Sequence, residues 1–553
     1  MSPVAGDAPR VDASVTRAGA VMALGTVGSR ITGFFRDVVM IWAIGTTVFA
    51  ETYNVANTIP NIIYILLAGG ALNAVFVPQL VRALRNDADG GKAFADRLIT
   101  AIGLVLLVVT VLTVIFAPLV IRSYAYTFSH SDSKADYDVA VTFARYFLPQ
   151  IFFYGLHVMF GQVLNARGKF GPMMFTPILN NVVVIVTGII FLTATHGHAV
   201  TPDSVSSGQV RLLGIGTTLG VVVQALALIP ALRATDYRFR PRFDLRGKGL
   251  GHSYGLAKWT LLFVAVNQVA YVAVVQLSTA AGLHAADTGY PGRGFTPYTK
   301  AYLIMLLPHA VVTVSVVTAL LPKMSRSVHD GRLDEVRADI VSGLRLTGAA
   351  IVPAAIGFGV LGPSLCIAMF AHGSTTVDNA QYIGFVLSAF ALGLVPFTVH
   401  YQLLRGFYAF EDTRTPVTIN VWIAGTNVAL AFACNAVLPD RWVAVGLAAS
   451  YSLSYLVGVG ISARKLSRRI GPLGAEVLRA YDRLIVAGVA AAVPTLLISE
   501  ICYRHWGNST TGSMVTVVLG GASLLIAYLV IAFRMGISEV ADLVSNVRTR
   551  LGR

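Results

Sequence analysis

Long apolar runs recur along the whole chain and are separated by short polar segments. Fourteen of these runs reach or exceed the roughly 20 residues that an α-helix needs to cross a bilayer. We expect transmembrane helices at 16–46, 51–81, 98–121, 139–164, 172–196, 209–232, 258–281, 297–321, 341–361, 380–404, 415–437, 442–463, 484–503 and 512–534. Pro60, Pro149 and Pro396 interrupt three of the runs, and in lipid such breaks require neighbouring helices or a water-filled cavity. The pattern predicts an all-α, polytopic membrane protein of about fourteen transmembrane helices.

The composition agrees with a membrane protein. Of the 553 residues, 55% are hydrophobic and 12% are charged, whereas soluble domains average about 25% charged residues. The formal net charge is +15 at pH 7, but the basic residues lie in short segments between apolar runs. No basic domain with interleaved aromatic residues is present, so the charge indicates membrane topology and not nucleic-acid binding.

Lysine and arginine are concentrated in every second loop. They are frequent in the segments 82–97, 233–248, 323–337 and 464–483, whereas 47–50, 197–210 and 362–379 contain neither residue. Loops rich in lysine and arginine face the cytoplasm. Both termini are therefore predicted to be cytoplasmic, as an even number of spans requires.

The sequence contains an internal repeat. FVPQLVR (76–82) is similar to LLPKMSR (320–326), and GQVLNARGKFGPMMFTPILNN (161–181) is similar to YQLLRGFYAFEDTRTPVTIN (401–420), at offsets of 244 and 240 residues. Each copy spans six helices in the same orientation, a design found in transporters that bind substrate between the repeats. We expect an N-lobe (16–240) and a C-lobe (241–470) around a central cavity. Two further helices (471–535) follow the lobes, with cytoplasmic segments at 1–15 and, basic in character, at 536–553.

The stretch GSRITGFFRD places Arg30, Arg36 and Asp37 inside the first apolar run. Charged residues within a membrane span are costly and usually face a bundle interior or an aqueous cavity. Arginine also binds phosphate oxygens in a bidentate geometry that lysine cannot match. The residues favour an anion site in which Asp37 positions an arginine. The alternatives are a simple pair between Arg36 and Asp37, or arginines that extend to the membrane surface.

Two other charged residues lie near the ends of spans. Glu51, at the outer start of the second span, either caps that helix or interacts with the charges of the first span. Lys300, near the start of the eighth span, is either an interfacial lysine or a cavity residue. The chain has no glycine-rich phosphate loop, HExxH motif or convincing pair of intramembrane carboxylates. We therefore predict a transporter without catalytic residues, metal site or cofactor.

An ordered series of short motifs extends through the chain. It comprises Ser29-Arg30-x-x-Gly33-x-x-Arg36-Asp37, ETYNVANTIPN (51–61), Phe76-Val77-Pro78, Leu164-Asn165 to Pro177, Leu307-Pro308, Leu321-Pro322, and Phe407-Tyr408 to Pro416. This series, which covers roughly residues 16–535, resembles the MurJ/MviN family of bacterial lipid II flippases. Tyr64 and the loop pattern resemble actinobacterial members of that family.

The resemblance implies a fold, a substrate and partners. The fold is that of the multidrug/oligosaccharidyl-lipid/polysaccharide exporters, with two six-helix lobes and, in 471–535, a groove for the lipid tail. The substrate is lipid II, an undecaprenyl-pyrophosphate-linked disaccharide-pentapeptide that is moved from the inner to the outer leaflet of the cytoplasmic membrane by alternating access. Membrane lipids and cell-wall synthesis or division proteins are the other partners implied, and nucleic acid is not.

The resemblance also implies binding residues. Arg30, Arg36 and Asp37 match family positions of the substrate site, in which the arginines hold the pyrophosphate and Asp37 would orient them. Glu51 and Asn61 belong to the matching motif of the second span. Two family arginines are replaced in this chain, by Tyr64 and by Leu303. Lys300 lies one turn before Leu303, and we expect it to substitute for the second arginine. The acidic residues with which some relatives bind sodium are missing from 258–281 and 415–437.

Three alternatives to a lipid II flippase are compatible with the sequence. A related exporter could carry another polyprenyl-linked oligosaccharide or drugs, although a drug antiporter needs membrane-embedded carboxylates for cation coupling. A membrane enzyme acting on polyprenyl-phosphate would need acidic metal ligands or a histidine and arginine set near one membrane face. A scaffold for cell-wall enzymes would transport nothing.

Overall fold

The computed structural model describes residues 13–66, 80, 83, 87, 89–130, 134–244, 254–473 and 475–540. Throughout these segments the regular secondary structure is helical. The expected basic tail beyond residue 540, the end of the second span and most of the first FVPQLVR copy lie outside the described residues.

The first half of the chain forms helices that agree with the apolar runs. They are α1 (Ala13–Ile44), α2 (Val48–Leu66), α4 (Lys92–Ile115), α5 (Ala117–Tyr124), η2 (Tyr126–His130), α6 (Lys134–Phe147), α7 (Gln150–Ala166), α8 (Gly171–Ala194), α9 (Ser207–Leu226) and α10 (Leu228–Arg233). Pro149 separates α6 from α7, because proline lacks the N–H that would continue the helical hydrogen bonds. By contrast, α2 continues through Pro60.

The second half contains longer helices. They are α11 (Tyr254–Asp287), α12 (Phe295–Pro308), η3 (His309–Thr313), α13 (Val314–His329), α14 (Leu333–Phe370), α15 (Val377–Ala409), α16 (Arg414–Val437), α17 (Asp440–Ile470), α18 (Ala475–Trp506) and α19 (Thr510–Arg534). The eighth expected span is formed by α12 and α13 with the π-helical turn η3 between them. Helix α15 continues through Pro396.

Twelve helices in the described part of the chain are long and apolar enough to cross a membrane. Helices α1 and α2 are not among them, and they carry Arg30, Arg36, Asp37 and Glu51. The all-α, polytopic membrane fold is thus confirmed, and the count of fourteen spans stays a prediction.

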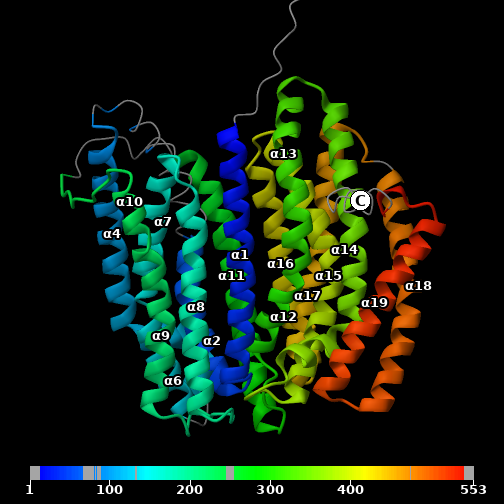
Figure 1. Cartoon of the computed structure of the whole chain (residues 1–553), viewed down its shortest axis with the longest axis horizontal. Helices are drawn as coiled ribbons and strands as arrows, with labels where there is room; N and C mark the ends of the chain where they lie inside the picture. The colour runs from blue at the N-terminus through cyan, green and yellow to red at the C-terminus, as the bar shows by residue number, and fades with distance from the viewer. Residues whose placement is uncertain are drawn as a thin grey trace, which may run out of the picture.

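The helices divide into two groups that meet at α1, α11 and α12 (Figure 1). One large buried cluster joins residues between Met40 and Tyr237, with additions from α11 and α12, and a second joins residues between Val274 and Ala448 with additions from α1. A separate cluster packs α18 and α19 against α14. The lobe boundaries at 240 and 470 stay predictions.

The end of α1 is fastened to the loop between α14 and α15. The Ser374 backbone N–H donates to the Trp42 carbonyl at 2.8 Å, and the Ser374 hydroxyl donates to the Ala43 carbonyl at 2.9 Å. The Thr375 hydroxyl donates to the Ile41 carbonyl at 2.8 Å. The carbonyls of Trp42 and Ala43 lie in the last turn of α1, where no intrahelical donor remains for them, and the Ile41 carbonyl also accepts the Gly45 backbone N–H at 2.9 Å. The loop therefore donates hydrogen bonds to carbonyl groups at the end of α1 and joins the two groups of helices there.

Candidate functional site

A cavity of about 580 Å³ lies where the two groups of helices meet, a volume within the range of roughly 300–1,000 Å³ typical of ligand sites. Its polar lining residues are Arg36, Asp37, Asn54, Asn57, Thr58, Asn61, Asn267, Gln268, Thr299, Lys300, Asn427 and Ser454, together with five tyrosines. A second cavity of about 110 Å³ shares Arg36, Asp37, Asn54, Asn57, Asn61 and Lys300 with it. These shared residues therefore separate two spaces inside the membrane protein.

Arg36, Asp37 and Lys300 form a charge cluster in the wall of both cavities. Asp37 Oδ2 accepts a hydrogen bond from Arg36 Nη2 at 3.0 Å, and Asp37 Oδ1 accepts one from Lys300 Nζ at 3.0 Å. With two cations and one anion, the charge cluster is net positive. Both cations retain N–H groups beyond those that Asp37 accepts. The charge cluster can therefore bind an anion that enters either cavity.

Asn181, on α8, holds Arg36 in place. Its Oδ1 accepts a hydrogen bond from Arg36 Nη1 at 3.2 Å, while its Nδ2 lies 2.9 Å from Thr32 Oγ1 and 3.1 Å from the Ser29 carbonyl. A Cβ at Gly33 would lie 3.4 Å from Asn181 Nδ2, an ordinary van der Waals contact, so this turn of α1 packs directly against Asn181. The sequence analysis missed Asn181, although an asparagine pair within the apolar run 172–196 was a signal that could have identified it.

The other expected arginine does not join the charge cluster. The side chain of Arg30 is exposed and lines neither cavity. Asn61 lines both cavities, whereas Tyr64 lines neither and packs on Tyr154 with ring centroids 4.7 Å apart. Leu303 lines the larger cavity one turn from Lys300. The proximity of Lys300 and Arg36 supports the expected substitution, and the binding role of each residue stays a prediction.

Glu51 occupies a position that the sequence did not suggest. It is 3% exposed, and its two carboxyl oxygens accept hydrogen bonds from the backbone N–H groups of Phe295 at 3.0 Å and Thr296 at 2.8 Å. These N–H groups lie in the first turn of α12 and have no intrahelical acceptor. A Cβ at Gly294 would come within 2.9 Å of Glu51 Oε1. Glu51 therefore caps a helix of the other half of the chain. Neither expected alternative, a cap on its own helix or contact with the charges of α1, is correct.

A comparison with known proteins identifies related sequences over nearly the whole chain. The family model described as lipid II flippase MurJ matches residues 40–519. The probable lipid II flippase MurJ of Rhizobium tropici is 27% identical over 95% of each chain. The protein of the same name from Vibrio cholerae is 25% identical over 95% of this chain and 98% of its own. The lipid II flippase MurJ of Burkholderia cenocepacia is 28% identical over 72% of this chain and 74% of its own.

Solved structures share the fold. A lipid II flippase MurJ in an inward closed conformation superposes with a TM-score of 0.72 at 19% identity, over 93% of this chain and 99% of that one. An inward-facing multidrug resistance MATE family transporter of the MOP superfamily superposes with a TM-score of 0.61 at 15% identity, over 79% and 95%. At these identities the structures show the fold alone. Because the family model matches most of the sequence, the protein belongs to the lipid II flippase MurJ family.

Proposed function

We propose that the protein is a lipid II flippase that moves the undecaprenyl-pyrophosphate-linked peptidoglycan precursor from the inner to the outer leaflet of the cytoplasmic membrane. The observation that carries this proposal is the charge cluster, in which Arg36 and Lys300 share Asp37 in the wall of a large cavity. Membership of the family supports the same activity.

The pyrophosphate is the part of the substrate that the charge cluster would bind. Arg36 would contact phosphate oxygens through its planar guanidinium, and Lys300 would add a point charge from α12. In the absence of substrate, Asp37 holds both cations towards the cavity and offsets part of their repulsion. When pyrophosphate binds, the spare N–H groups of both cations contact it directly. Arg36 thus keeps the role of the family arginine that it matches, and Lys300 takes the place of the family arginine that falls on Leu303.

Transport would proceed by alternating access of an N-lobe (16–240) and a C-lobe (241–470). Arg36 and Lys300 come from different lobes, so a bound pyrophosphate would join the lobes at the centre of the molecule. The contacts of Glu51 with α12 and of Ser374 with α1 hold the lobes together near the end of α1. If the termini are cytoplasmic, these contacts close the outer side, and their release would deliver the headgroup to the outer leaflet.

The lipid tail would remain in the membrane during this movement. Helices α18 and α19 pack on α14 at the edge of the C-lobe (Figure 1). Many of their large apolar side chains are exposed, among them Leu497, Ile501, Val518 and Ile526. We assign the groove for the undecaprenyl chain to 471–535, and expect cell-wall synthesis or division proteins as further partners.

Growth of a bacterium depleted of its own lipid II flippase tests the proposal. Expression of the wild-type chain should restore growth, whereas Arg36→Ala/Lys300→Ala should not, at equal protein levels in the membrane. Arg504→Ala, at an exposed residue of α18, is the matched control and should restore growth fully. Lack of rescue by membrane-inserted wild type would contradict the flippase function, and full rescue by the double variant would contradict the assigned site.

A further inference from the structure

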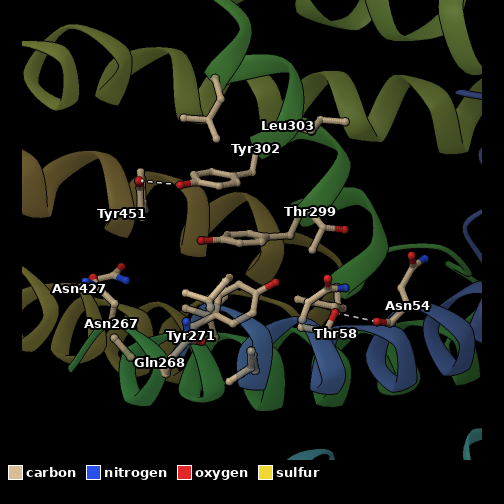
Figure 2. A pocket seen from close by; sticks show the side chains of 18 of the residues that line it. Asn54, Thr58, Asn267, Gln268, Tyr271, Thr299, Tyr302, Leu303, Asn427 and Tyr451 are labelled. Atoms are coloured by element: carbon tan, nitrogen blue, oxygen red, sulfur yellow. Dashed lines mark hydrogen bonds between the residues drawn. The ribbon is translucent and has the colours of Figure 1, made fainter. Parts of the chain in front are cut away.

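The larger cavity has a second polar region in which no charged side chain takes part. It is formed by Asn267 and Gln268 of α11 and Asn427 of α16, with Tyr302 and Tyr451 nearby in the lining. Figure 2 shows Asn267, Gln268 and Asn427 at one side of the view, well separated from Asn54 of α2 at the other. The cavity therefore has room for a neutral polar group in addition to the anion bound by the charge cluster.

Several amide oxygens in this cavity have no hydrogen-bond partner among the described residues. Asn427 is 7% exposed, yet its Oδ1 is unpaired, as are Oε1 of Gln268 and Oδ1 of Asn57. An unpaired buried acceptor costs about 1–3 kcal/mol, and few are found in folded proteins. All three residues line the larger cavity. The oxygens themselves are buried within the lining, so a ligand that brings hydroxyl or amide N–H donors would satisfy them once the amide groups rotate towards the cavity.

The tyrosines beside these amides are held in fixed positions. The hydroxyl groups of Tyr302 and Tyr451 lie 3.2 Å apart, and their rings meet edge to face with centroids 5.4 Å apart. The Asn267 amide is oriented by its own hydrogen bond to the Phe263 carbonyl at 3.0 Å. Aromatic rings and amides in the lining of one cavity provide an apolar surface and polar groups together. This combination matches a pyranose, which has C–H groups on its faces and hydroxyl groups at its edges.

We infer that Asn267, Gln268 and Asn427, together with Tyr302 and Tyr451, form a subsite for the amino-sugar residues of the transported headgroup. The inference rests on the proposed lipid II function and adds to it a site that binds the sugars separately from the pyrophosphate. The pyrophosphate of lipid II is bonded directly to its first sugar. A headgroup held by Arg36 and Lys300 therefore places that sugar within the same cavity. The N-acetyl N–H and the sugar hydroxyls would supply donors to the unpaired oxygens after the amide groups turn towards the cavity.

Binding measurements on the full-length purified protein in nanodiscs test the subsite. The probes are lipid II and undecaprenyl pyrophosphate, which has the same tail and phosphates but no sugar. Wild type should bind lipid II more tightly, and Asn267→Ala/Asn427→Ala should weaken lipid II binding by roughly tenfold to a hundredfold. The affinity of this variant for undecaprenyl pyrophosphate should stay unchanged. Asn508→Ala, at an amide on the surface, is the matched control and should change neither affinity.

A third probe distinguishes the sugars from the peptide. Lipid II from which the stem peptide has been removed should be bound as lipid II is, with the same loss in the double variant. If removal of the peptide abolishes that loss, the amides bind peptide and the inference is wrong. The inference is also wrong if the double variant binds lipid II as tightly as wild type does. It is wrong as well if the double variant loses affinity for lipid II and for undecaprenyl pyrophosphate to the same extent. Wild type that binds undecaprenyl pyrophosphate but shows no preference for lipid II would overturn the subsite alone. Wild type that binds neither lipid would contradict the proposed function itself.

Discussion

Replacing Glu51 by alanine should weaken the contact between α2 and α12 that holds the two halves together near the end of α1. The change leaves the backbone N–H groups of Phe295 and Thr296 without their acceptor. Each buried donor left unpaired costs about 1–3 kcal/mol, so the closed arrangement should lose about 2–6 kcal/mol relative to an open one. Since about 1.4 kcal/mol is a tenfold change in an equilibrium constant, the closed population should fall at least about tenfold relative to the open one. Glu51→Gln keeps one acceptor oxygen and should have a smaller effect.

Distance measurements between spin labels can detect this change. Labels at Thr201, in the loop before α9, and Val437, at the end of α16, lie on opposite halves of the molecule. In a background without native cysteines, Glu51→Ala should add a population with a longer separation, and Glu51→Gln should add less. Glu500→Ala removes an exposed carboxylate of α18 and should leave the distances unchanged. Identical distance distributions for wild type and Glu51→Ala would refute the assigned role of the carboxyl group.

Two further substitutions test helix packing and a loop. Gly384→Ala should lower the thermal unfolding temperature in detergent, because its Cβ would lie 2.3 Å from the Cα of a proline in α14, and overpacking typically costs about 1–3 kcal/mol. A Cβ at Gly425 would have no atom within 4 Å, so Gly425→Ala is the control. Equal unfolding temperatures for Gly384→Ala and Gly425→Ala would contradict the close packing of α15 against α14. Asp412 lies in the loop after α15, where burial alone would raise its pKa, but hydrogen bonds from Thr415 and Arg469 lower the pKa below its ordinary value. Because folding lowers the pKa of Asp412, its ionised carboxylate stabilises the folded loop at pH values above the unfolded-state pKa of about 4. This stabilisation is lost as the pH falls below about 4. Amide hydrogen exchange in residues 410–413, corrected for intrinsic rates, should therefore accelerate below about pH 4 in wild type but not in Asp412→Asn. The same dependence of exchange rate on pH in both proteins would show that Asp412 does not stabilise the loop.

The sequence predicted most helix positions well, because the ends of an apolar run coincide with the ends of a membrane helix. The run 172–196 corresponds to α8 (Gly171–Ala194), and 415–437 corresponds to α16 (Arg414–Val437). Breaks within a run were harder to predict from proline alone. Pro149 separates two helices whereas α15 continues through Pro396, and the outcome depends on packing that a single sequence does not contain.

The candidate site was predictable where a residue is costly in the membrane. Arg36 and Asp37 were identifiable because charged side chains inside a membrane span are energetically costly and usually functional. The partner of Glu51 was not predictable, because it lies more than two hundred residues away and consists of backbone N–H groups. Helical periodicity places Arg30 and Asp37 on one face of α1 but does not reveal which part of that face another helix covers. Asn427 resembles any asparagine in an apolar run until its neighbours are known.

Translocation of lipid II by the purified protein in liposomes tests the central claim most directly. Wild type should move lipid II between leaflets, and Arg36→Ala/Lys300→Ala, folded and inserted to the same extent, should do so at least about tenfold more slowly because the pyrophosphate loses both cations. Equal rates for wild type and the double variant would contradict the claim that the charge cluster carries the headgroup through the membrane.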